Sequence, residues 1–195
     1  MISVQPPKPR YTVDDTFAAL RITIPARRSW SIVLFLGIWL SGWVVGEVLA
    51  GTIMIRGLAG LLTGKTETVG DPWGTVGGLG LLFWLALWTV GGVVALAMWL
   101  WNVAGKETVF INGESLTVRT SVFGIGRSRQ YSAVYVDRLR ASGDRDRSQS
   151  PWGGGLTFDY GGIAVNFGLG LSQTEANEIA ALIGSRFPAL TRAVE

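Results

Sequence analysis

An apolar stretch from Gly77 to Gly105 constrains this chain more than any other feature of its sequence. No charged residue lies between Asp71 and Lys106. A helix that rises about 1.5 Å per residue crosses a hydrocarbon core of about 30 Å with about 20 apolar residues. The stretch exceeds that length, so it predicts a membrane-spanning helix over residues 77–104.

A second apolar run, from Trp30 to about Ile55, predicts another membrane-spanning helix over residues 30–55. The mean hydropathy of the chain is +0.35, and charged residues make up 16% of it. Soluble domains carry about 25% charged residues, so this composition favours a protein that lies partly in lipid. Residues 56–76 are glycine-rich and carry an Asp-Pro turn, so we expect an exposed loop between two antiparallel helices.

Small residues recur every four positions in both runs. This spacing lets two helices approach closely enough for van der Waals contact to hold them together in lipid. The alternative is that glycine and alanine are simply frequent in membrane helices. We expect the helices to pack on the following residues: Gly42, Gly46 and Ala50 in the first run, and Gly91 and Ala95 in the second.

Two pairs of tryptophans lie well inside the runs, Trp39 with Trp43 and Trp84 with Trp88. Residues four apart share one face of a helix. Two interpretations stay open. The rings face lipid or pack within the hairpin, or they form a contact surface for another membrane subunit or a flat lipid-soluble molecule.

Lysine and arginine are unevenly distributed around the runs, with five before the first, two between the runs and ten after the second. Cytoplasmic segments carry the excess of these residues. We therefore expect a multi-pass membrane protein with residues 1–29 and 105–195 in the cytoplasm. The residues expected to anchor the cytoplasmic interface are Arg27, Arg28, Trp30, Trp99 and Trp101.

From Lys106 onward, apolar and polar residues alternate as in β-strands. The pattern predicts six short antiparallel strands, the first two joined by an Asn112-Gly113 turn. A final helix is expected from Ser172, which can form a capping box with Glu175. Residues 20–24 show the same alternation before the first run, in a segment otherwise expected to be a tail.

Two segments carry a family resemblance, GKETVFINGESLTVRTSVFGIGRSRQY (105–131) and LTFDYGGIAVNFGLGLSQTEANEIAALI (156–183). With the two-helix anchor, they resemble small bacterial membrane proteins that carry a cytoplasmic pleckstrin-homology-like (PH-like) domain. The resemblance implies that the membrane is the bacterial inner membrane. It also implies an α+β fold, a curved sheet of seven strands capped by the C-terminal helix. Residues 20–24 would supply the seventh strand. A fold of this kind implies binding or assembly rather than chemistry.

The chain has no histidine and no cysteine, which removes imidazole and thiol chemistry. We expect no enzyme activity, no cofactor and no metal site, since no acid pair or nucleophile motif is present either. Nucleic acid is not an expected partner, because no concentrated basic face is found. Glu47 is the only acid in the predicted spans; it is either interfacial or a proton or ion site, with no second group for a relay.

The leading functional expectation is a non-catalytic accessory subunit that docks on and stabilises a larger membrane complex, with a photosynthetic or respiratory complex as a natural host. Its partners would be membrane lipids and other integral membrane subunits. The alternative is a membrane-tethered PH-like module that binds anionic lipid headgroups or a signalling partner. Arg127 and Arg129 are the candidate headgroup ligands.

Overall fold

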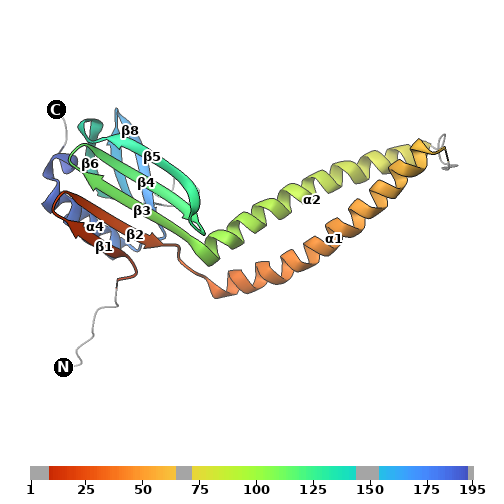
Figure 1. The fold of residues 1–195 in the computed structure, drawn as a ribbon, viewed down its shortest axis with the longest axis horizontal. Helices are drawn as coiled ribbons and strands as arrows, with labels where there is room; N and C mark the ends of the chain where they lie inside the picture. Colours follow the sequence, from red (N-terminus) through yellow and green to blue (C-terminus); the bar gives the residue numbers. More distant parts are fainter. Residues whose placement is uncertain (1–8, 65–71, 144–153, 193–195) are drawn as a thin grey trace, which may run out of the picture. The chain divides into compact units, whose positions relative to one another are not determined.

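A computed structural model describes residues 9–64, 72–143 and 154–192 of the chain. The chain divides into two units. One, residues 28–102, is helical; the other combines residues 1–27 with residues 103–195 and contains the strands (Figure 1).

The helical unit consists of α1 (Trp30–Leu62) and α2 (Pro72–Ala104), each of 33 residues. Within them, Trp30–Gly57 and Leu79–Ala104 are long and apolar enough to cross a membrane, with mean hydropathies of 2.0 and 2.1. Only 6% and 11% of their most apolar windows are buried, unlike core helices of a soluble fold. Both helices exceed their predicted bounds, because the adjoining residues are also compatible with helix.

The sheet unit contains one five-stranded antiparallel sheet with the order β1-β2-β3-β4-β5. Its strands are β1 (Thr12–Thr16), β2 (Ala19–Pro25), β3 (Gly105–Asn112), β4 (Ser115–Val122) and β5 (Ile125–Ser132). The pairing of β2 with β3 confirms that residues 20–24 join the strands that follow the helices. β1 was not predicted, because Asp14 and Asp15 disfavour strand formation and only pairing with β2 overrides that preference.

A second antiparallel sheet has the order β6-β7-β8. The short helix η1 (Ala133–Tyr135) connects β5 to β6 (Val136–Ala141), and β7 (Gly154–Tyr160) and β8 (Ile163–Leu169) follow. The C-terminal helix α4 (Gln173–Arg186) and a 3-10 turn, η2 (Pro188–Thr191), complete the unit. The expectation of six strands after the helices is thereby confirmed in the part of the chain that the structure describes.

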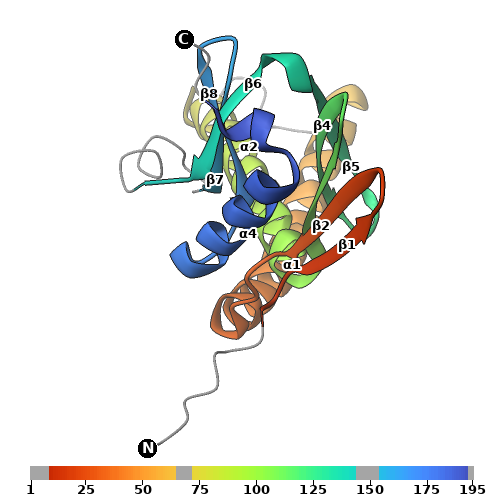
Figure 2. The same ribbon diagram turned by 90° about the vertical axis from the view of Figure 1, so that its left-hand side faces the viewer.

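One apolar core lies between the two sheets, and α4 covers one opening of it (Figure 2). The side chains of Leu20, Ile111 and Phe158 are fully buried there. Ala176, Ile179 and Ile183 form the buried face of α4. The predicted capping box is present: Ser172 Oγ accepts from the Glu175 backbone nitrogen, and the Glu175 carboxylate accepts from the Ser172 backbone nitrogen.

Candidate functional site

The inner face of the first sheet changes from apolar to cationic towards β5. Cross-strand pairing aligns side chains of β2 to β5 in rows, in which paired residues point to the same face. Two adjacent rows are Ile22–Val109–Val118–Arg129 and Ile24–Glu107–Thr120–Arg127. Both rows therefore begin in the apolar core and end in an arginine on the edge strand.

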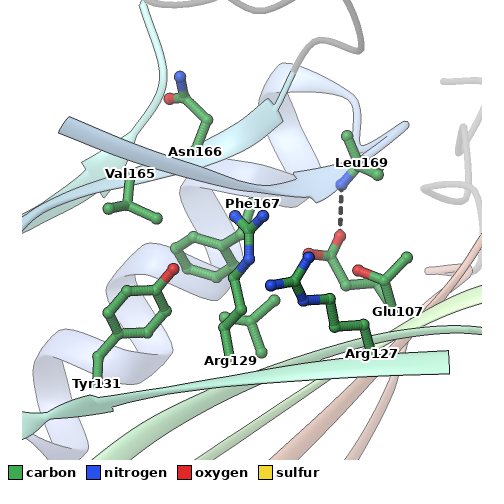
Figure 3. A pocket seen from close by; sticks show the side chains of 10 residues that line it. Glu107, Arg127, Arg129, Tyr131, Val165, Asn166, Phe167 and Leu169 are labelled. Atoms are coloured by element: carbon green, nitrogen blue, oxygen red, sulfur yellow. Dashed lines mark hydrogen bonds between the residues drawn. The ribbon is translucent and has the colours of Figure 1, made fainter.

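These arginines line a pocket of about 320 Å³ between the first sheet and β8. Figure 3 shows the guanidinium groups of Arg127 and Arg129 rising from β5 towards β8. Tyr131, next on the same face of β5, and Phe167 of β8 form aromatic parts of the wall. The pocket thus combines an apolar wall with a few polar groups, which is the usual composition of a small-ligand site.

Glu107 is the one acidic residue in the lining, and its carboxylate is already engaged. Its Oε2 accepts hydrogen bonds from the backbone nitrogens of Gly168 at 2.9 Å and Leu169 at 2.8 Å. Gly168 has a φ of 75°, a left-handed conformation that presents these two donors side by side. Burial raises the pKa of the Glu107 carboxyl above its usual range, and the two hydrogen bonds offset part of that increase.

The two arginines differ from Glu107 because both are exposed and unpaired. In residues 9–64, 72–143 and 154–192, no carboxylate lies within 4.0 Å of either guanidinium. Guanidinium stays charged at every physiological pH and offers five N–H donors in a planar fork. The site can therefore bind an anion with several oxygens, such as a phosphate group.

Tyr131 is positioned by ring contacts with the second sheet. Its ring meets Phe158 and Tyr160 edge to face, with 5.1 Å between centroids in both pairs. Edge-to-face packing restrains the ring. Its hydroxyl points into the pocket in Figure 3 and can add a donor beside the two arginines.

The packing of the helical hairpin differs from the prediction at two of the five small residues. A Cβ atom on Gly42 or Gly91 would meet nothing within 4 Å, so neither glycine packs against the other helix. Gly46 does face α2, where a Cβ would lie 3.7 Å from the Trp88 ring. Ala50 and Ala95 are half-buried. The glycine that contacts a bulky partner is Gly92, whose Cβ would overlap the indole of Trp43.

Three of the four inner tryptophans, Trp39, Trp43 and Trp88, make contacts between α1 and α2, which supports the interpretation that they pack within the hairpin. Trp43 Nε1 donates to the backbone oxygen of Trp88 at 3.3 Å. Trp39 and Trp84 contact the Trp88 ring at centroid distances of 5.9 and 5.0 Å, the latter stacked. Trp84 remains 51% exposed, so among the four tryptophans it is the residue best placed to contact another membrane subunit.

The predicted interface residues and Glu47 are placed as follows. The Arg28 guanidinium lies 5.4 Å from the Trp30 ring centroid, and Arg27 is exposed. Trp99 Nε1 donates to the backbone oxygen of Val33 at 2.9 Å, and Trp101 is half-buried. Glu47 Oε1 accepts from Thr89 Oγ1 at 2.6 Å and so joins the two helices. The location of these residues at a membrane surface stays a prediction.

Glu107 and Tyr131 are site residues that the sequence reasoning missed. Glu107 shares the alternation of Val109 and Ile111, so a charged residue occupied a core-facing position of a predicted strand. The sequence alone could therefore have indicated that Glu107 is buried. The donors from Gly168 and Leu169 could not be predicted, because they come from a strand more than sixty residues away.

No protein-family model, curated protein or solved structure matches this chain. Among the described residues, no group of three or more His, Cys, Asp or Glu is placed to hold a metal ion. The candidate site therefore rests on the geometry of the pocket itself.

Proposed function

We propose that this protein is a membrane-tethered PH-like module that binds the phosphate of an anionic lipid headgroup in the pocket lined by Arg127 and Arg129. The observation that carries the proposal is a pair of guanidinium groups with no carboxylate partner among the described residues, beside a carboxylate that already accepts two hydrogen bonds. A phosphate can accept two parallel hydrogen bonds from each arginine.

The architecture supports a PH-like assignment. Strands β2 to β5 form one antiparallel sheet, β6 to β8 form another, and a C-terminal helix follows them. β1 is an addition at the edge next to β2. The pocket volume of about 320 Å³ suits a headgroup better than a whole lipid.

Titration of the full-length protein in zwitterionic nanodiscs tests the headgroup site. Short-chain phosphatidylglycerol is the probe, and inorganic phosphate in a parallel arm shows whether the site takes the free ion equally well. We expect Arg127→Gln and Arg129→Gln each to weaken binding about tenfold, which corresponds to about 1.4 kcal/mol. Arg21→Gln is the matched control, because Arg21 is exposed on another strand of the same sheet. Unchanged binding in the double variant would overturn the proposal.

The topology belongs to the same proposal: α1 and α2 span the bacterial inner membrane, and both termini are cytoplasmic. The chain has no cysteine, so one introduced thiol reports its own side of the membrane. A membrane-impermeant thiol reagent should label Val134→Cys only after the cells are permeabilised. Labelling in intact cells would contradict the orientation.

Docking of the hairpin on a larger membrane complex is a second candidate function, because Trp84 stays half exposed while it stacks on Trp88. The host would be a photosynthetic or respiratory complex. Mild detergent extraction and native electrophoresis should show the protein in a large assembly. Trp84→Ala should release it, whereas Phe83→Ala, at a neighbouring and more exposed position, should not. Migration of the wild-type protein alone would exclude this function.

A further inference from the structure

We propose that the β4–β5 turn, residues Phe123 and Gly124 with the adjoining Ile125, is a second contact with the bilayer in which Phe123 inserts between lipid headgroups. The inference rests on the proposed membrane span of α2. The cations Arg127 and Arg129 also line the headgroup pocket, but the side chain that inserts, Phe123, is not part of that lining.

Chain connectivity places this turn at the end of the sheet unit where the chain enters and leaves the helices. β3 begins at Gly105, directly after the last residue of α2. Only residues 26–29 separate β2 from α1, a link that spans at most about 14 Å. Pro25 and Lys106, at the ends of these two links, are register partners. Both covalent links to the helices therefore leave the sheet unit from this end of the first sheet.

The strand register places the β4–β5 turn at the same end of the sheet as Gly105. Gly105 pairs with Val122, and Val122 pairs with Ile125. Neighbouring strands lie about 4.8 Å apart, so the turn is within about 10 Å, across the sheet, of the residue that follows α2. If α2 crosses the bilayer, Phe123 reaches the headgroup region on the same side.

The side chains of the turn are unusual for an exposed hairpin loop. Phe123 is 67% exposed and Ile125 is 84% exposed. Phe123 also has a φ of 51°, a conformation in which bulky residues are disfavoured and Asn, Asp or Gly is usual. Arg119 Nη2 donates to the Gly124 backbone oxygen at 3.0 Å and holds the turn in this shape. In water, Phe123 is unfavourable both because of its backbone conformation and because its ring is exposed. Insertion of the ring into lipid would remove the second cost and offset the first.

The charges on the three strands around the turn suit an anionic membrane surface. β3, β4 and β5 carry four cations, Lys106, Arg119, Arg127 and Arg129, all of them exposed. Their one acid is Glu107, which is buried and held by backbone donors. Basic residues beside an apolar side chain are attracted to anionic headgroups, and the attraction falls off within a Debye length.

The opposite end of the first sheet offers a matched control. Val134 in η1 is 81% exposed. Its neighbour Ala133 donates to the backbone oxygen of Glu114 in the β3–β4 turn at 2.9 Å. The eight residues of β4 separate that turn from Phe123. An equally apolar side chain thus lies about 25 Å from the proposed contact.

Spin labels on single introduced cysteines test the proposal in the full-length protein reconstituted in anionic vesicles. The collision rates with oxygen, which concentrates in lipid, and with a water-soluble nickel chelate are compared. A label at Phe123→Cys should prefer oxygen, and one at Val134→Cys should prefer the chelate. A label at Leu87→Cys, on α2, reports whether the helix spans the bilayer. If position 87 is in lipid and position 123 is as accessible to the chelate as position 134, the proposal is overturned.

A second probe separates insertion from a disturbed turn. The label is placed at Ile125→Cys, with either the native Phe123 or Phe123→Asn. Asn accepts the positive φ, so the turn keeps its shape while its apolar side chain is removed. We expect the oxygen preference at position 125 to be lost in the Asn background. An unchanged preference would show that Phe123 does not anchor the turn. A water-exposed label at position 87 would instead refute the membrane span on which the inference rests.

Discussion

The helical unit and the sheet unit use apolar side chains in opposite ways. In the sheet unit the large apolar residues face one another, and Phe158 and Phe167 are nearly inaccessible. In the helical unit they face outward, and Phe83 on α2 is 69% exposed. Burial away from water stabilises the first arrangement. The second is stable only where the surroundings are themselves apolar.

The polar contacts show the same contrast. Between α1 and α2, Trp43, Thr89 and Trp99 each donate a hydrogen bond to the other helix. Such bonds and close ring packing hold helices together where no water is expelled. In the sheet unit the carboxylate of Glu107 likewise joins the two sheets, at a buried position that lines the arginine pocket. This contrast favours a lipid environment for the helical unit, and the membrane location itself stays a prediction.

The largest expected difference between the units is the effect of removing a phenylalanine ring. Phe158→Ala should lower the free energy of unfolding by about 3–5 kcal/mol, because it leaves a cavity in the core. Phe83→Ala should change it by less than about 0.5 kcal/mol. Denaturant unfolding of the full-length protein in detergent, followed by circular dichroism, measures both. Equal losses would refute the contrast between the units.

Adjacent glycines in α2 test how the hairpin packs. Gly92→Ala places a methyl group against Trp43 and should destabilise the hairpin by about 1–3 kcal/mol. Gly91→Ala meets no neighbour and should be neutral. The measurement is the loss of helical circular dichroism as a denaturing detergent is added. A larger loss of stability for Gly91→Ala would instead support the helix packing predicted from the four-residue spacing.

Glu107 gives the sheet unit a pH dependence of known sign. Its raised pKa means that the folded state binds its proton more tightly than the unfolded state. This contribution to stability is complete below the unfolded pKa, near 4.5, and is lost as the pH rises through the folded pKa. Stability of the wild type relative to Glu107→Gln should therefore fall above pH 4.5. Denaturant unfolding of the two proteins at a series of pH values measures this difference.

The smallest expected effect concerns the contact between the N-terminal segment and α4. Partial burial acts to raise the pKa of Glu175, but hydrogen bonds from Arg10 and Ser172 lower it to about 2. The stability it contributes is present above pH 4.5 and is lost as the pH falls towards 2.

Arg10→Ala should reduce that acid dependence, because the hydrogen bonds from Ser172 remain, and should cost less than about 1 kcal/mol, because the pair lies at the surface. Arg186→Ala is the control, since it breaks another contact of α4 with the β1–β2 segment without touching Glu175. Acid unfolding curves of the three proteins provide the comparison. An identical acid midpoint in wild type and Arg10→Ala would contradict the role of this pair.

Much of the fold follows from periodicity in the sequence. The two apolar runs, the strand at residues 20–24 and the helix capped by Ser172 were all predicted, because burial or lipid imposes a repeat on neighbouring residues. β1 was missed, because Thr12–Thr16 carries two aspartates and a single apolar residue. Its strand state comes from the partner it pairs with rather than from its own composition.

The candidate site was predicted only in part. Arg127 and Arg129 were named as candidate headgroup ligands, but nothing in the sequence indicated which strand would face them. The pocket needs β8 opposite them, and the distance in sequence between β5 and β8 gives no local signal. The same holds for the hairpin, where the four-residue spacing suggested contacts at Gly42 and Gly91, whereas the structure places the rings of Trp43 and Trp88 against Gly92 and Gly46.

What the sequence determined by itself is the division into two apolar helices and an antiparallel sheet unit, because solvent preference and side-chain alternation are properties of consecutive residues. Only the tertiary structure decided where charges meet. It placed Arg127 and Arg129 across from β8, and it satisfied Glu107 with the backbone of Gly168. Those contacts depend on strand register and on which sheets face each other, and residues far apart in the chain set both.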